Sequence, residues 1–291
     1  MITLWAPDGI GEVTEDTDLT GEILAAVDAA PPGPLVDGDI LVVTSKIISK
    51  LEGRARPAAE RDAWLRRETV RTLARKVRAT IVASQGGLVQ AAAGIDNSNV
   101  ASDTILLLPA DADASAERLR TGVAERRGIR VGVIISDTAG RTWRIGQTDH
   151  AIGCAGVVPL LDFDGRTDPY GNELRVTLTA VADELAAAAD LVKGKLSGRP
   201  VAVVRGRADL VTGAPASAHE IIRPVSEDLF HLGSREAVLM AILESAGARE
   251  RYEDLVWSDN PDEVIAAVGL SGVRAQLAQE LLTTANRWNS P

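Results

Sequence analysis

"VGVIISDT" (Val131–Thr138) is the stretch that decides the fold, because an apolar run ends here in a carboxylate and a hydroxyl. Its first five residues predict a strand that is apolar on both faces and therefore covered on both sides. Burial of the Asp137 carboxylate is unfavourable unless a cation or hydrogen-bond donors meet it. The stretch therefore predicts a buried strand that ends at a polar site.

Strands and helices alternate on either side of this stretch. Apolar, β-branched runs predict further strands at residues 39–46, 79–84, 104–109 and 200–206. Helical spacing predicts helices at residues 61–77, 115–128 and 178–195, the second starting at Ser115 as N-cap and stopping at Gly128. The pattern stays helical from residue 226 to the end. We therefore expect one domain over residues 1–225 and a helical C-terminal segment over 226–291.

Composition narrows the class of protein. The chain has 291 residues, is 45% hydrophobic and carries a net charge of −10, which suits a globular protein and argues against nucleic-acid binding. Its single cysteine, Cys154, excludes an internal disulfide and a thiolate metal cage and suits a cytoplasmic location. The start of the chain has no basic and apolar leader pattern, and no apolar run is long enough for a membrane span.

The end of the strand at 39–46 is followed at once by cations. "TSKIISKLEGR" carries Ser45, Lys46, Lys50 and Arg54. Because open sheets bind ligands at the carboxyl ends of their strands, this cluster could hold a phosphate or a carboxylate. A solvated strand end with surface lysines explains the same residues.

A second cluster is the oxygen-rich turn in "GLVQAAAGIDNSNV". Asp96, Asn97, Ser98 and Asn99 favour a local Asx-turn, and this alone accounts for the pattern. Alternatively, Asp96 is a ligand of a hard divalent cation and Asn99 contacts a bound molecule.

The third cluster follows the deciding strand. "SDTAGRTWRIGQTDHAIG" places Arg141 and Arg144 among glycines after Asp137, which is compatible with a loop that binds an anion or with a surface loop of self-compensating charges. The chain has no Walker motif, and its three histidines lack metal-ligand spacing. Two aspartates in separate loops with cations beside each favour metal-assisted chemistry on phosphate or carboxylate groups.

These clusters together resemble the coenzyme F420-0:L-glutamate ligase family. The resemblance rests on "GDILVVTSKIISKLEGR", "GLVQAAAGIDNSNV", "ISDTAGRTWRIGQTDHAIGCAG" and "PVAVVRG", which occur in order over about residues 37 to 206. It implies an α+β fold with a mixed sheet, an intertwined homodimer and a helical C-terminal extension. It also implies a GTP-dependent enzyme that joins L-glutamate through a γ-linked amide to coenzyme F420-0, by way of an acyl phosphate, with room for further glutamates.

The resemblance also assigns roles to single residues. It implies two divalent ions, Mg²⁺ or Mn²⁺, with K⁺ as a further candidate. Asp96 and Asp137 would bind the first divalent ion and Thr138 the second. The GTP would contact Ile10, Gly11, Glu12, Val13, Ser45, Lys50 and Asn99. Arg141 and Arg144 are the candidates for holding substrate carboxylates in the reaction. Lys195 stands where some relatives have an acidic ligand of the second ion.

Two other functions are alternatives to this one. One is a nucleotide-dependent carboxylate–amine ligase with a different acceptor. The other is a non-catalytic protein that binds the deazaflavin coenzyme, for which loss of Asp96 or Asp137 would be the expected signature. Both aspartates are present, which favours an enzyme.

Overall fold

The structure is a computed structural model that describes residues 1–76, 79–98, 100–175 and 177–289. The chain divides into two compact units. Unit 1 contains Met1–Ala59 and Asp96–Ile222, and unit 2 contains Glu60–Ile95 and Arg223–Pro291. Each unit is therefore built from two separate segments of the sequence.

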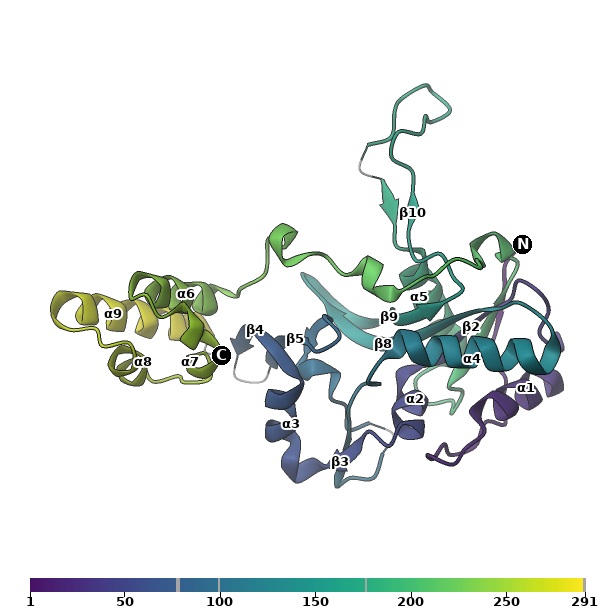
Figure 1. The fold of residues 1–291 in the computed structure, drawn as a ribbon, viewed down its shortest axis with the longest axis horizontal. Coiled ribbons are helices and arrows are strands. Elements are labelled where there is room, and N and C mark those ends of the chain that lie inside the picture. Colours follow the sequence, from purple (N-terminus) through teal and green to yellow (C-terminus); the bar gives the residue numbers. More distant parts are fainter. Residues whose placement is uncertain (77–78, 99, 176, 290–291) are drawn as a thin grey trace. The chain divides into compact units, whose positions relative to one another are not determined.

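Unit 1 is organised around a five-stranded sheet with the order β1-β12-β2-β8-β9. Its strands are β1 (Thr3–Trp5), β12 (Val201–Arg205), β2 (Ile40–Thr44), β8 (Gly132–Arg141) and β9 (Arg144–Ala155). Only the β2–β8 pair among these is parallel, and the other neighbours run antiparallel. The sheet is therefore mixed, and together with the helices it confirms the predicted α+β class (Figure 1).

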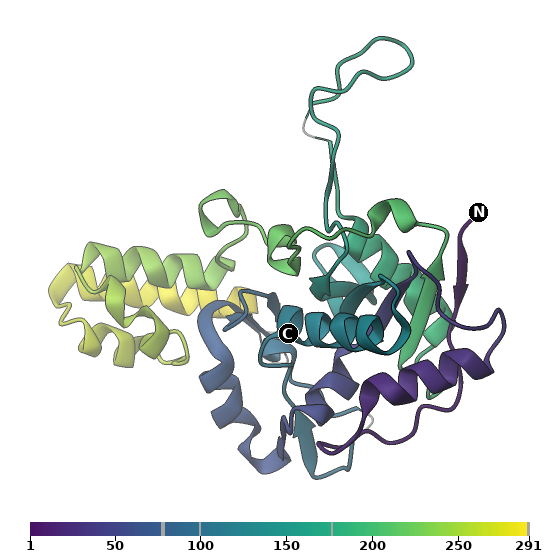
Figure 2. The same ribbon diagram turned by 45° about the vertical axis from the view of Figure 1, so that its right-hand side comes forward.

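Both faces of this sheet are covered, as the apolar strand sequences predict. Ile40 and Val42 lie in one core cluster with helix α5 (Val181–Lys193). Leu41 alternates with them and is also fully buried, so it faces the opposite side. On that side α4 (Ala112–Arg127) packs on β8 and β9, and α1 (Leu19–Ala29) lies beside α4 (Figures 1 and 2).

Helix α4 begins earlier than its sequence predicts. Asp111 is its N-cap and accepts a hydrogen bond from the backbone N–H of Ala114, at 2.9 Å, so the prediction of Ser115 as the cap is wrong. Ser115 lies inside the helix, and its hydroxyl donates to Glu52 instead. The predicted stop is confirmed, since Gly128 ends the helix in the left-handed conformation that glycine adopts without strain.

Residues 136–153 form a long hairpin rather than the loop expected after the strand. Strand β8 continues past Asp137 to Arg141, and β9 returns antiparallel from Arg144, with Arg141 opposite Arg144 at the turn. The strand continues because each of its polar residues has a partner in the β9 ladder, which local charge patterns do not reveal. The hairpin leaves Trp143 and Ile145 exposed at its end.

The remaining strands of unit 1 form two small pairs. β3 (Ala55–Pro57) pairs with β7 (Thr104–Leu106), and β10 (Leu161–Asp162) pairs with β11 (Leu178–Thr179). The segment between β10 and β11 extends away from the five-stranded sheet in both views (Figures 1 and 2). Tyr170, within this segment, is 91% exposed.

In unit 2, the predicted helix over residues 61–77 is wrong beyond residue 68. Helix α3 spans only Arg61–Glu68, and Thr69–Lys76 forms strand β4. The β-branched residues Thr69, Val70 and Thr72 lose rotamer freedom in a helix and favour a strand. β4 pairs antiparallel with β5 (Ala79–Ser84), which pairs with β6 (Val89–Ala91). The long-range partner therefore overrides the local helical spacing.

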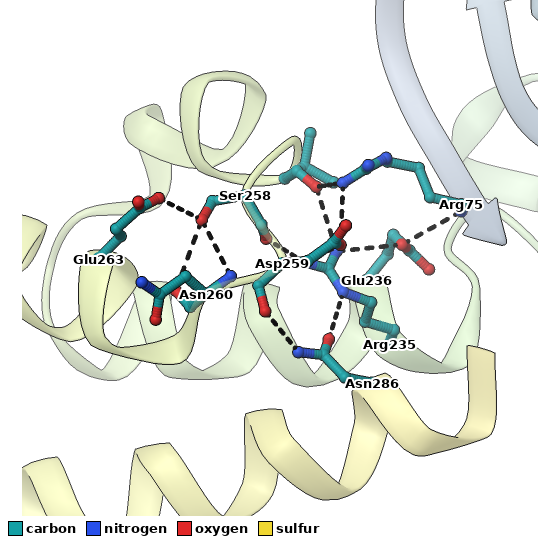
Figure 3. A network of polar contacts seen from close by, with 9 residues as sticks. Arg75, Arg235, Glu236, Ser258, Asp259, Asn260, Glu263 and Asn286 are labelled. Carbon is teal, nitrogen blue, oxygen red and sulfur yellow. Dashed lines mark hydrogen bonds and ion pairs between the residues drawn. The ribbon is translucent and has the colours of Figure 1, made fainter. Parts of the chain in front are cut away.

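The C-terminal segment is helical, as predicted, and contains α6 (Ser234–Ser245), α7 (Tyr252–Leu255), α8 (Pro261–Ala267) and α9 (Gly272–Asn289). These helices share a core and also bind β4, because the Tyr252 hydroxyl donates to the carbonyl of Thr72 at 2.8 Å. Arg235 is buried at the centre of a polar network, donating to Asn286 on α9 and to the carbonyl of Val256 (Figure 3). Strand β4 and these helices therefore form one folding unit.

Short 3-10 helices lie at Ala58–Glu60, Ala92–Gly94, Ala208–Leu210, Ala218–Ile221, Val225–Glu227 and Arg249–Arg251. None of the described helices is both long and apolar enough to cross a membrane.

Candidate active site at the start of helix α2

The candidate site lies where strand β2 ends beside its parallel neighbour β8. Thr44, the last residue of β2, is paired with Ser136 of β8, so Ser45 and Asp137 are the next residues of the two neighbouring segments, although β8 itself continues to Arg141. Ser45 is the first residue of helix α2 (Ser45–Leu51), and its hydroxyl donates to Asp137 Oδ1 at 3.0 Å. The structure thus brings Ser45 and Asp137 into direct contact, and the prediction that this cluster holds a phosphate or carboxylate stays a prediction.

Asp137 is a partly buried carboxylate with few donors. Burial raises its pKa, and the nearby negative charge of Asp149 adds to this. The hydrogen bond from the Ser45 hydroxyl, the electrostatic effect of His150 and the backbone N–H of Thr138 act in the opposite direction and do not outweigh the burial. A carboxylate of this kind is stabilised in its ionised form by a cation, so it suits a hard divalent ion.

Asp96 forms an ion pair with Lys46, the residue that follows Ser45 in helix α2. Lys46 Nζ lies 2.6 Å from Asp96 Oδ2, and Lys46 also donates to the Ser98 hydroxyl. The backbone N–H of Ser98 donates to Asp96 Oδ1 at 2.8 Å, which is the predicted Asx-turn. Burial alone raises the pKa of Asp96, but the donors from Lys46 and Ser98 and the lysine charge outweigh it and lower the pKa.

Two consecutive residues of α2 therefore hold the two candidate metal ligands. Ser45 binds Asp137 of strand β8, and Lys46 binds Asp96 of the turn that contains Ser98. In the part of the chain that the structure describes, no group of three or more His, Cys, Asp or Glu side chains is gathered as a metal site. Asp96 and Asp137 supply hard oxygen ligands, but a cation at Asp96 would compete with the Lys46 ammonium.

Thr138, the predicted ligand of the second ion, is hydrogen-bonded to Asp149 of strand β9. Its hydroxyl donates to Asp149 Oδ1 at 2.7 Å, directly across the β8–β9 ladder. Asp149 Oδ2 accepts from Ser136 at 2.9 Å and from Lys193 Nζ at 2.8 Å. Burial raises the pKa of Asp149, but Lys193 and the two hydroxyls outweigh it and lower that pKa.

Sequence reasoning missed Lys193. The signal was its place on the buried stripe of α5, eight residues after Leu185 and four after Ala189, where a lysine is unexpected. Its partner could not be read from this spacing, because Asp149 lies on another element.

The structure brings together some of the residues that are predicted to contact GTP. Lys50 Nζ lies 2.6 Å from Glu12 Oε1, so the segment Ile10-Gly11-Glu12-Val13 is tied to α2. Val13 is buried, whereas Gly11 and Glu12 are exposed. Asn99, the remaining predicted contact, lies outside the described residues.

Arg141 and Arg144 stand apart from these contacts. They face each other at the turn of the hairpin, four and seven residues beyond Asp137 along the chain, and both are exposed. Within the described chain they are not bonded to Asp96, Asp137 or Asp149. Their assignment to substrate binding stays a prediction. Lys195, the position at which some relatives have an acidic ligand, is exposed just after α5.

Carboxylates and lysines that meet beyond the end of strand β2 suit an enzyme that acts on anionic substrates. The model of the F420-0:Gamma-glutamyl ligase family matches residues 9–206, which include the site residues described above. The chain belongs to this family.

Similar curated proteins support the assignment. A coenzyme F420:L-glutamate ligase of Archaeoglobus fulgidus is 39% identical over 78% of this chain and 96% of its own length. A ligase of the same name from Haloarcula marismortui is 35% identical over 80% of this chain and 97% of its own length. Another from Methanocaldococcus jannaschii is 36% identical over 68% of this chain and 86% of its own length.

Proposed function

We propose that this chain is a coenzyme F420-0:L-glutamate ligase that uses GTP to form a γ-linked glutamyl amide. The observation that carries the proposal is the family match over residues 9–206, within which Ser45 contacts Asp137 and Lys46 contacts Asp96. The similar proteins bear this ligase name.

The reaction needs two group transfers. A carboxylate oxygen of coenzyme F420-0 attacks the γ-phosphorus of GTP, and GDP leaves. The amine of L-glutamate then attacks the resulting acyl phosphate at carbon, an amide forms, phosphate leaves, and the amine loses a proton. Neither step needs a side-chain nucleophile.

Charge compensation is the main task of the site. Asp96 and Asp137 would hold one divalent ion and Thr138 a second, and such ions neutralise developing charge on phosphoryl oxygens. Lys46 in the first turn of α2 and Lys50 in its last turn supply cations, for which GTP would replace Asp96 and Glu12 as the anionic partners. Ser45 keeps Asp137 in place through its hydrogen bond.

Mass spectrometry tests the activity. Purified protein is incubated with coenzyme F420-0, L-glutamate, Mn²⁺ and GTP, with ATP in a parallel reaction. Products heavier by one or more glutamyl units, formed with GTP and metal, are expected from the wild type and not from Asp137→Asn, whose fold should be intact. GTP cleavage without a mass shift would indicate a ligase with another acceptor. Coenzyme binding without product or cleavage would indicate the binding protein.

We further propose that the chain works as a homodimer. The support is the exposure of Trp143 and Ile145 at the end of the β8–β9 hairpin, at 79% and 103%, since large apolar side chains gathered on a projecting element favour association. Light scattering after size exclusion is expected to give twice the mass of one chain. Charged substitutions, Trp143→Glu with Ile145→Lys, are expected to give the monomer mass, and a wild-type monomer would refute the proposal.

A further inference from the structure

Behind Thr138 lies a buried ion pair that the proposed reaction does not use directly. Lys193 Nζ is 2.8 Å from Asp149 Oδ2, and the side chains of the two residues are 5% and 4% exposed. Lys193 is the last residue of α5, whereas Asp149 lies on β9, so the pair ties a helix end to the sheet. Replacing a buried ion pair by apolar residues is often neutral for stability, so stability alone gives little reason for this one.

The hydrogen bonds of this pair have a fixed direction. The Lys193 ammonium can only donate, and it donates to both Asp149 and the Ser136 hydroxyl. Ser136 donates in turn to Asp149 Oδ2. The Asp149 carboxylate can only accept, so the Thr138 hydroxyl must turn its hydrogen toward it.

A bulge in the hairpin sets Asp149 opposite Thr138. Ile135 pairs with Gly153, but the next residue, Ser136, pairs with Ala151, which leaves Ile152 as the extra residue of β9. With regular pairing, His150 would stand opposite Thr138 instead of Asp149. The irregular register therefore creates the contact that orients the Thr138 hydroxyl.

We infer that Asp149 and Lys193 are positioning residues that hold the Thr138 hydroxyl as a ligand for a divalent cation. With its hydrogen directed to Asp149, the Thr138 oxygen keeps its lone pairs for a metal ion. This inference rests on the proposed function, because it uses the assignment of Thr138 to the second ion. Loss of such a partner behind a metal ligand typically weakens metal affinity by about 10- to 100-fold.

The test measures Mn²⁺ affinity, by electron paramagnetic resonance and calorimetry, with Mn²⁺ alone and with Mn²⁺ and GDP. Removing one charge of a buried pair endangers folding, so the pair is replaced together as Asp149→Asn/Lys193→Met. Thr138→Val removes the hydroxyl at nearly constant shape. Each variant is expected to bind Mn²⁺ at the Thr138 site about 10- to 100-fold more weakly than the wild type.

The combined variant separates positioning from a general structural effect. If Asp149 and Lys193 act through Thr138, adding their substitutions to Thr138→Val should weaken Mn²⁺ binding little further. The matched control is Asp39→Asn/Arg205→Met, which removes another ion pair of the same sheet, with Asp39 buried, and should leave Mn²⁺ affinity unchanged.

Four outcomes would overturn the inference. Wild-type Mn²⁺ affinity in the Asp149→Asn/Lys193→Met variant, or full additivity with Thr138→Val, would refute the positioning role while the metal site stands. If the Asp39→Asn/Arg205→Met control weakens Mn²⁺ binding equally, the loss of Mn²⁺ affinity reflects lost stability of the sheet. Thermal melting curves of the variants measure that stability. Absence of Mn²⁺ binding by the wild type would refute the metal site itself and this inference with it, whereas ligase activity is judged separately by the mass of the product.

Discussion

Ser45 Oγ lies 3.0 Å from Asp137 Oδ1, although the two residues are 92 positions apart in the sequence. The contact exists because β2 and β8 are parallel neighbours and Thr44, the last residue of β2, is paired with Ser136 of β8. It also lowers the pKa of a carboxyl whose burial raises it. The ionisation of Asp137 on β8 is therefore linked to Ser45, the residue that follows strand β2.

Ser45→Ala is expected to move the acid limb of the pH–rate profile to higher pH. The variant loses a hydrogen bond that favours ionised Asp137, so the pKa of Asp137 rises and the carboxylate forms only at higher pH. Initial rates of ligation between pH 5 and pH 9 provide the measurement. Ser49→Ala, at a buried serine one turn further along α2, is the control. Coincident acid limbs for Ser45→Ala and the wild type would contradict the link.

Arg141→Ala and Arg144→Ala are each expected to raise the KM for L-glutamate or for coenzyme F420-0 by about 10-fold or more, because a charge-assisted hydrogen bond contributes about 1.5–3 kcal/mol. Their exposure predicts unchanged melting temperatures. Steady-state kinetics with each substrate varied give the result. The control is Arg130→Ala, an arginine just before β8 whose side chain is 79% exposed. Wild-type KM values in both hairpin variants would remove these arginines from substrate binding.

Cys154 is expected to be unreactive toward thiol reagents in the folded protein. Burial raises its pKa to about 12, and the charges of Asp113 and Glu220 contribute further. The reactive thiolate is therefore scarce in the folded chain at pH 8 and forms more readily on unfolding. For the same reason this group stabilises the fold less as the pH rises above 9, where the unfolded thiol ionises first. Labelling followed by mass analysis, with and without denaturant, measures the reactivity of the Cys154 thiol. Rapid labelling without denaturant would contradict the prediction that this thiol is unreactive in the folded protein.

Gly153→Ala is expected to lower the free energy of unfolding by about 1–3 kcal/mol, because it overpacks the core. A Cβ at Gly153 would lie 2.4 Å from the backbone carbon of Ala112, so β9 and α4 would have to separate. Gly140→Ala is the matched control on β8, since a Cβ there meets no atom within 4 Å. Denaturant titration of both variants gives the comparison, and equal stabilities would show that α4 can move without cost.

The sequence predicts the elements whose signals are local. The buried strand at 39–46, the stop at Gly128 and the amphipathic helix over α5 follow from apolar pattern and glycine conformation, and the structure confirms them. The strand at Thr69–Lys76 was predicted as a helix, because its pairing with β5 is a long-range contact that spacing does not contain. The same holds for the site: the clusters at Ser45 and Asp96 were recognised by composition, whereas the Lys193–Asp149 pair depends on tertiary packing.

The discontinuity of unit 2 has a consequence for synthesis of the protein. Strands β4–β6 leave the ribosome before residues 96–222 of unit 1, whereas helices α6–α9 of unit 2 follow that segment. The contact between Tyr252 and Thr72 cannot form until Tyr252, 180 positions after Thr72, has been synthesised. Over that interval the nascent three-stranded sheet lacks the helices that pack on β4, which exposes it to aggregation and to the chaperones that prevent it.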